Sequence, residues 1–111
     1  MKSTVSIKEN RVYRLMYNRA KSVVLRNIVV YARKNGKNYN RLGLTSTKTV
    51  GKAVERNRSR RLMKEAYRLN ESKIKLGYDF ILVARTRCKD AVYCDVEKDL
   101  LTAFSRLSLF L

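Results

Sequence analysis

The sequence predicts one α+β domain, a layered sandwich with the element order helix, two or three strands, helix, strand, helix. Two observations carry this prediction. Segments with apolar residues at helical spacing alternate with short runs rich in Val, Ile and Tyr, which favour strands. No proline, low-complexity tract or internal repeat divides the 111 residues, a length that suits a single core. We therefore expect a single domain over residues 1–111.

The first half of the chain predicts one helix and a pair of strands. Helical spacing of apolar residues indicates a helix over 10–21, and enrichment in Val, Ile and Tyr indicates a strand over 23–33. Residues 35–38 contain Gly and Asn, which tolerate the positive φ that hairpin turns need. They lead into an expected return strand over 40–47.

The second half predicts a helix, a buried strand and a last helix. A strongly basic helix is expected over 51–72, and the nearly all-apolar run 79–85 is typical of a central strand buried on both faces. A loop over 86–91 follows, and Asp95 is expected to cap the last helix. The apolar stripe of that helix consists of Val96, Leu100, Leu101, Phe104 and Leu107.

The charge of the chain indicates a polyanionic partner. Lys and Arg number 26 against 9 Asp and Glu, which gives a net charge of +17. A small domain tuned only for solubility carries a charge of magnitude about 2–8. Nucleic acid is the first candidate and an anionic membrane surface the second. The membrane alternative is weaker, because the apolar face of the basic helix is needed for the core.

Several other classes of protein are not favoured. The N-terminus has no apolar segment of a secretory signal, and no apolar run approaches the roughly 20 residues that span a bilayer. Cys88 and Cys94 form no CxxC pair, and the chain has no His, so no zinc-binding pattern is present. We expect both cysteines to be reduced thiols in a cytoplasmic protein.

The basic helix has two contrasting faces on a helical wheel. Its expected packed side holds Leu62, Met63, Ala66 and Leu69, with Val54 at the edge. Its expected cationic strip holds Arg56, Asn57, Arg60, Arg61, Lys64 and Arg68, with Arg58 at the border. Charges opposite an apolar face are often only a solvated surface. A strip of one sign, dominated by Arg, instead suits phosphates and stacked bases.

Aromatic residues favour RNA over DNA as the partner. Tyr13, Tyr17, Tyr31 and Tyr39 add faces on which unpaired bases can stack beside the cations. A DNA-binding regulator would need a dimer and base contacts, and no helix-turn-helix pattern precedes the basic helix. A ribosomal or general RNA-binding protein fits the charge and size equally well. No nucleophile–base pair or metal cluster indicates catalysis by the protein itself.

The segment from Lys48 to Lys64 resembles the signature of the protein subunit of bacterial ribonuclease P. The family pattern is K-x-x-G-x-A-V-x-R-N-R-x-[KR]-R-x-x-[KR], and this chain has KTVGKAVERNRSRRLMK. The stretches NRVYRLMYNRAKSV, RLGLTSTK and GYDFILVAR are also similar to the family's first helix, a strand and its last strand. The resemblance therefore covers most of the chain.

The resemblance implies a fold and an activity. The fold is an αβββαβα sandwich with a central sheet, helices and a left-handed βαβ crossover, like domain 2 of ribosomal protein S5. The activity is endonucleolytic removal of the 5′ leader from precursor tRNA. The RNA subunit performs the hydrolysis, with Mg²⁺ held mainly by RNA, so no protein side chain is catalytic. The protein binds the ribonuclease P RNA and the leader of precursor tRNA, without a membrane, and we expect the free protein to be a monomer.

The resemblance also implies roles for particular residues. Contacts to the catalytic RNA would come from Lys48, Arg56, Asn57, Arg58 and Arg61. The cleft that holds the leader would be formed by Tyr13, Tyr17, Tyr31, Arg60 and Lys64, to which we add Arg68.

The chain departs from the family pattern at four places. Tyr13 and Tyr17 stand where many members carry Phe, which keeps stacking and adds a hydroxyl. Ala20 stands where a turn Gly is common, and Thr49 replaces a second Lys. The apolar end over 107–111 has none of the basic tail that some members carry, and we expect it to pack onto the domain or to self-associate.

Overall fold

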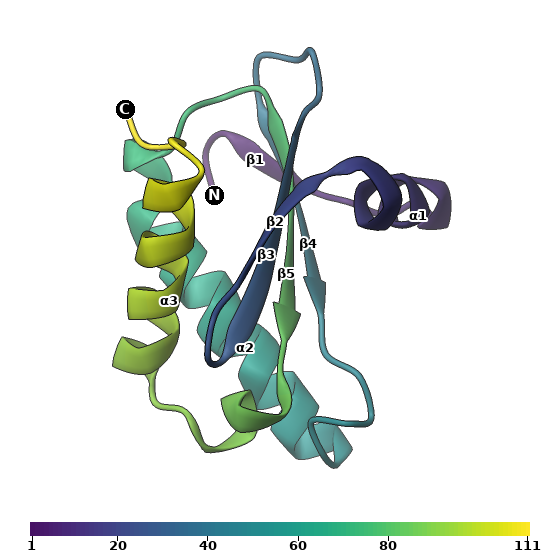
Figure 1. Cartoon of the computed structure of the whole chain (residues 1–111), viewed down its shortest axis with the longest axis vertical. Coiled ribbons are helices and arrows are strands. Elements are labelled where there is room, and N and C mark those ends of the chain that lie inside the picture. The colour runs from purple at the N-terminus through teal and green to yellow at the C-terminus, as the bar shows by residue number, and fades with distance from the viewer.

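A five-stranded mixed sheet lies between α1 on one face and α2 and α3 on the other (Figure 1). The structure is a computed structural model that describes residues 1–111. The strands are β1 (Thr4–Ser6), β2 (Lys21–Val24), β3 (Ile28–Lys34), β4 (Asn40–Thr45) and β5 (Tyr78–Ala84). The helices are α1 (Asn10–Arg19), α2 (Ala53–Asn70) and α3 (Tyr93–Arg106), with short 3₁₀ helices η1 (Glu71–Lys73) and η2 (Thr86–Asp90). The predicted α+β sandwich is confirmed.

The strand order is β1-β4-β5-β3-β2, so β5 occupies the centre of the sheet. It pairs parallel with β4 and antiparallel with β3. Phe80, Ile81 and Leu82 are all 0% exposed, which confirms the prediction of a strand buried on both faces. β4, α2 and β5 form the parallel βαβ unit for which the resemblance implies a left-handed crossover.

The predicted hairpin across residues 35–38 is wrong in its pairing. The turn exists, and Gly36 adopts a φ of 72° there, but β3 and β4 do not pair with each other. β5 lies between them, because its apolar residues need burial on both faces and the central position provides it. The expected single strand over 23–33 is also two strands: β2 begins at Lys21 and forms the antiparallel hairpin with β3.

β1 has no counterpart among the predicted strands, since three residues carry too short a pattern to indicate one. It pairs parallel with β4, and the Glu71 carboxylate after α2 fixes the chain around it. Glu71 accepts hydrogen bonds from the backbone N–H groups of Lys2 (3.0 Å) and Ser3 (3.3 Å) and from the Thr4 hydroxyl. Burial alone would raise the pKa of Glu71, but these donors outweigh it and lower that pKa.

The helix ends differ from the prediction by a few residues, as helix ends commonly do. α1 ends at Arg19 because the extended Ala20 (φ −77°, ψ 152°) starts the path into β2, a conformation that needs no Gly. α2 covers 53–70 within the expected 51–72, and η2 replaces the expected loop over 86–91. α3 begins at Tyr93, so Asp95 lies in its first turn, where its carboxylate accepts from the backbone N–H of Val92 at 3.1 Å.

The packed face of α2 agrees with the prediction at Met63 and Ala66 and differs from it at other positions. Its buried residues are Ser59, Met63, Ala66, Tyr67 and Asn70. Leu69 is 52% exposed and Val54 is 75% exposed, so their predicted place on the packed side is wrong. Tyr67 takes that side because its ring lies edge-on to Phe104 (6.4 Å between centroids) and its hydroxyl reaches the Thr4 hydroxyl at 2.8 Å.

Two apolar clusters hold the layers together. The larger joins the sheet to α2 and α3, and it includes Val96, Leu100 and Phe104 of the predicted stripe. The smaller joins α1 to the sheet through Ile7, Val12, Met16 and Ile81. The apolar C-terminus packs onto the larger cluster: Leu109 is 2% exposed, and Phe110 forms a β-bridge with Ile74. No helix is long and apolar enough to span a membrane.

Candidate nucleic-acid interface

α1 covers only part of the sheet face on which it lies. Beneath it is the cross-strand row Tyr31–Ile81–Gly43, in which Ile81 packs against α1. The next row, towards the C-terminal ends of β4 and β5, consists of Val29, Val83 and Thr45, all of them half-buried. The flank of α1 that carries Tyr13 and Tyr17, the neighbouring Tyr31 of β3 and this row together form a surface that we call the tyrosine cleft.

Three tyrosines cluster along this surface. The rings of Tyr13 and Tyr17 lie 6.3 Å apart between centroids, and those of Tyr17 and Tyr31 lie 5.1 Å apart with an edge-to-face angle of 81°. Tyr17 is 43% exposed, and its hydroxyl lies 3.4 Å from the Thr45 hydroxyl. The structure thus brings together the three aromatic residues assigned to the cleft, with ring surface available for stacking.

Tyr13 lies against the backbone of β4 because the residue beneath it is a glycine. A Cβ at Gly43 would come within 2.5 Å of the Tyr13 Oη atom. Burial raises the pKa of Tyr13, so its hydroxyl is neutral at ordinary pH. The absence of a side chain at Gly43 therefore determines how closely the α1 tyrosines approach the sheet.

Gly43→Ala is therefore expected to displace the Tyr13 ring and to weaken binding of single-stranded RNA. The ring can swing outward, so the loss of folding stability should be only about 1 kcal/mol. Urea unfolding and titration with a labelled oligoribonucleotide measure the two effects. In the Tyr13→Ala background the same change should have little further effect, because the clashing ring is gone. A full additional loss in that background would contradict this explanation.

Two cations of α2 reach the edge of β4 beside this surface. Tyr13 and Lys64 line a common cavity of about 380 Å³ together with Leu42 and Leu44 of β4 and residues of β1. Arg60 donates from Nη1 to the Ser46 carbonyl at 3.3 Å and from Nη2 to the Asn57 side-chain oxygen. Two of the three cations predicted to line the cleft, Arg60 and Lys64, therefore lie at its β4 side.

The other predicted RNA-binding residues differ in how many contacts their side chains make within the protein. Lys48, Asn57 and Arg61 are exposed, and the side chains of Lys48 and Arg61 make no ion pair or hydrogen bond within the chain. Arg56 donates to the Gly51 carbonyl at 3.1 Å. Arg68 pairs with Glu65 on the exposed face of α2, and the cavity shared by Tyr13 and Lys64 does not include it.

Arg58 makes contacts within the protein that sequence reasoning did not indicate. Its guanidinium donates to the carbonyls of Lys89 (3.2 Å) and Ala91 (2.7 Å). These bonds tie α2 to the end of η2 and the residue that follows it, more than 30 positions further along the chain. Only some of the N–H donors of the Arg58 guanidinium are therefore left to bind RNA.

Arg58→Ala should therefore lower the stability of the protein itself. The two bonded carbonyls would lose a charged donor, which is expected to cost about 1 kcal/mol, reduced from the buried case because Arg58 is partly exposed. Arg61→Ala is the matched control, since Arg61 makes no such bond. Urea unfolding should separate the two variants. Equal stabilities would show that the Arg58 contacts contribute nothing to the fold.

The acidic and sulfur-bearing side chains do not gather into a metal centre. No group of three or more His, Cys, Asp or Glu side chains is placed to hold a metal ion. Cys88 is buried and Cys94 is exposed, and both are free thiols. The site is a surface of cations and aromatic rings, the kind of surface that binds nucleic acid.

An aromatic cleft beside a row of cations, on a small basic α+β domain, defines an RNA-binding protein. A model of the family Ribonuclease P matches residues 1–108. The chain is 41% identical over 109 residues to the ribonuclease P protein component of Alkaliphilus oremlandii (strain OhILAs), with 98% of this chain and 96% of that protein covered. It is 42% identical over 107 residues to that of Clostridioides difficile (strain 630), with 96% and 94% covered. The chain belongs to the ribonuclease P protein family.

Solved structures agree with this assignment. The RNase P protein of Staphylococcus aureus superimposes with a TM-score of 0.85 at 31% identity, covering 96% of this chain and 97% of that chain. The RNase P protein from Thermotoga maritima gives a TM-score of 0.79 at 30% identity, covering 87% and 92%. The likeness thus extends over nearly the whole sandwich and includes α1 and the basic helix.

Proposed function

We propose that this chain is the protein subunit of ribonuclease P, which promotes removal of the 5′ leader from precursor tRNA. The observation that carries the proposal is the tyrosine cleft with Arg60 and Lys64 at its β4 side. Membership of the family indicates which reaction is involved, and the geometry of the cleft suits single-stranded RNA.

Two surfaces divide the work. The outward side of α2 and the turn before it, with Lys48, Asn57 and Arg61, would bind the catalytic RNA, and Arg56 and the remaining donors of Arg58 would add to it. The tyrosine cleft would take the leader, whose bases stack on exposed rings while its phosphates meet cations. Mature tRNA has no leader and cannot make these contacts, so the enzyme would favour precursor over product.

The protein would act by electrostatics and position, since hydrolysis belongs to the RNA. Each cation that meets a phosphate releases counterions, so assembly should weaken steeply as salt rises. Mg²⁺ would be held mainly by the RNA, as membership of the family implies. Cations beside the RNA would offset phosphate repulsion and lower the Mg²⁺ concentration needed. We propose the cytoplasm as the location and a monomer as the free state.

Reconstitution tests the proposal. The purified protein, a bacterial ribonuclease P RNA and a precursor tRNA with a 5′ leader are combined at a Mg²⁺ concentration too low for the RNA alone. Restored cleavage at the mature 5′ end is the expected result. Unchanged cleavage across several such RNAs, with the protein still bound, would make it a general RNA-binding protein.

A further inference from the structure

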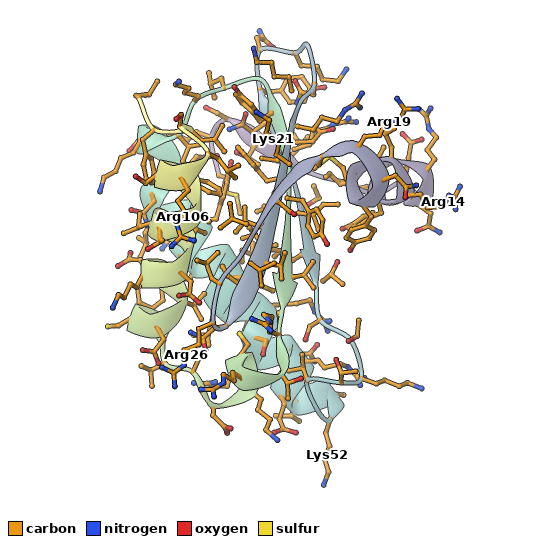
Figure 2. All side chains as sticks on the ribbon, in the orientation of Figure 1. Arg14, Arg19, Lys21, Arg26, Lys52 and Arg106 are labelled. Carbon is orange, nitrogen blue, oxygen red and sulfur yellow. The ribbon has the colours of Figure 1, made fainter.

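A second basic surface lies at the opposite edge of the sheet from the β4 edge that Arg60 and Lys64 reach. It surrounds a cavity of about 320 Å³ where β2 and β3 meet the end of α3. Four cations line it, two before and at the start of β2 and two at the end of β3: Arg19, Lys21, Arg33 and Lys34. Figure 2 shows Arg19 at the end of α1 and Lys21 at the start of β2. We call this cavity the β2–β3 pocket.

The charge of the β2–β3 pocket is not balanced within the protein. All four cations are exposed. The three ion pairs of the molecule involve other cations: Arg11, Arg41 and Arg68. Asp79, whose position on β5 pairs with Arg33, is already bound by both Nε and Nη2 of Arg41 at 2.7 and 2.6 Å. Four like charges around one cavity therefore repel one another until an anion enters.

The floor of the pocket is apolar and partly aromatic. It contains Ala32, Leu107, Leu109 and the ring of Tyr78. Tyr78 is held in place by a parallel stack on Phe80, with 5.9 Å between centroids and 12° between planes. The cavity volume falls within the range of about 300–1,000 Å³ that is usual for sites holding small molecules. An apolar floor with a cationic rim suits a planar base with phosphates at its edge.

We propose that the β2–β3 pocket is a second RNA site, which takes one unpaired nucleotide and the phosphates that flank it. The floor would receive the base, and Lys21, Lys34 and the two arginines would meet the phosphates. Cations at both edges of the sheet would let the molecule bridge two RNA segments. This inference rests on the proposed function only for the presence of RNA, and it assigns the pocket neither to the leader nor to the signature of α2.

The test is titration of the protein with a short labelled single-stranded oligoribonucleotide at several salt concentrations. The Lys21→Ala/Lys34→Ala variant should lose affinity about fivefold to tenfold. The slope of log affinity against log salt concentration should become shallower by about 1.4, as expected for two lost contacts to phosphates of a single strand. The matched control, Lys89→Ala/Lys98→Ala, removes the same charge from exposed positions outside the pocket. If both variants lost the same affinity, the loss would be explained by net charge alone, and the proposal would be overturned.

Methyl NMR of the intact protein gives a second readout, for which no residue of the β2–β3 pocket is changed. Leu107 and Leu109 signals should shift saturably with the oligoribonucleotide, and should still do so in the Arg60→Ala/Lys64→Ala variant. Unmoved methyls, or shifts obtained only with double-stranded RNA, would overturn the proposal. Failure here would leave leader discrimination by Arg60 and Lys64 intact. Failure of reconstitution with the methyls still shifting would instead contradict the proposed function alone.

Discussion

Arg60→Ala/Lys64→Ala should weaken the binding of precursor tRNA to the reconstituted enzyme by about 2 kcal/mol, or roughly thirtyfold, and leave mature tRNA almost unchanged. Both side chains lie at the β4 side of the tyrosine cleft, where a leader phosphate would meet them. Mature tRNA lacks the leader and therefore loses no contact. The measurement is the dissociation constant of each tRNA under conditions that permit binding without cleavage.

Two controls give this prediction its specificity. Lys52→Ala/Lys89→Ala removes two exposed charges away from the cleft and should weaken both tRNAs slightly and equally. Arg60 also binds the Ser46 carbonyl, so its removal could disturb the end of β4. The single variant Lys64→Ala avoids this, and it should still weaken precursor tRNA more than mature tRNA, by a smaller factor than the double variant. Losses of equal size for precursor and mature tRNA would remove the leader from this cleft.

Asn40→Ala should produce the largest loss of folding stability, about 3 kcal/mol. Asn40 is 0% exposed at the start of β4. Its amide nitrogen donates to the Lys75 carbonyl (3.1 Å) and to the Tyr67 hydroxyl (3.3 Å), and its side-chain oxygen accepts from the backbone N–H of Tyr78 (3.0 Å). One side chain thus joins β4, α2 and the start of β5, and its loss leaves several buried groups without partners.

Equilibrium urea unfolding measures this loss. Asn38→Ala is the matched control, because Asn38 is exposed and its side chain makes no hydrogen bond, so its change should be within about 0.5 kcal/mol. Asn40→Asp keeps an acceptor for Tyr78 but no donor for Lys75, so it should also destabilise the protein near neutral pH. A stability of Asn40→Ala close to that of Asn38→Ala would show that the network is dispensable.

The elements with strong local patterns could be predicted from the sequence. The nearly all-apolar run of β5 indicated a central strand, and the stripe of α3 placed Val96 and Phe104 in the core. The order of the strands could not be predicted, because it depends on β5 entering between β3 and β4 from more than 30 residues further along the chain. β1 was beyond local reasoning for the same reason, since its partners are β4 and Glu71.

Hydrophobicity alone placed Met63 and Ala66 of α2 correctly but misplaced the rest of its packed face. Tyr67 and Asn70 count as polar residues, yet both are buried because their polar atoms find partners: Tyr67 at Thr4, and Asn70 at the Ala66 carbonyl (2.8 Å). The apolar Leu69 therefore faces solvent. The pattern of polar and apolar residues in the sequence does not show which polar groups will find hydrogen-bond partners in the folded protein.

The candidate site shows the same division. Resemblance to a family supplied the candidate residues, and the i,i+4 spacing of Tyr13 and Tyr17 was enough to place both on one flank of α1. It did not show that Arg58 is bound to the Lys89 carbonyl or that Arg68 pairs with Glu65. Those contacts depend on where other side chains and carbonyls lie in the folded chain.

Photocrosslinking from two positions tests the central claim, that the tyrosine cleft and the outward side of α2 meet different RNAs. A photoreactive group is attached to a cysteine introduced by Tyr17→Cys or by Arg61→Cys, in a background with the exposed Cys94 changed to Ser. The holoenzyme carries precursor tRNA labelled in its leader. Position 17 should crosslink the leader, and position 61 should crosslink the catalytic RNA. Crosslinks from both positions to the same RNA would contradict the account.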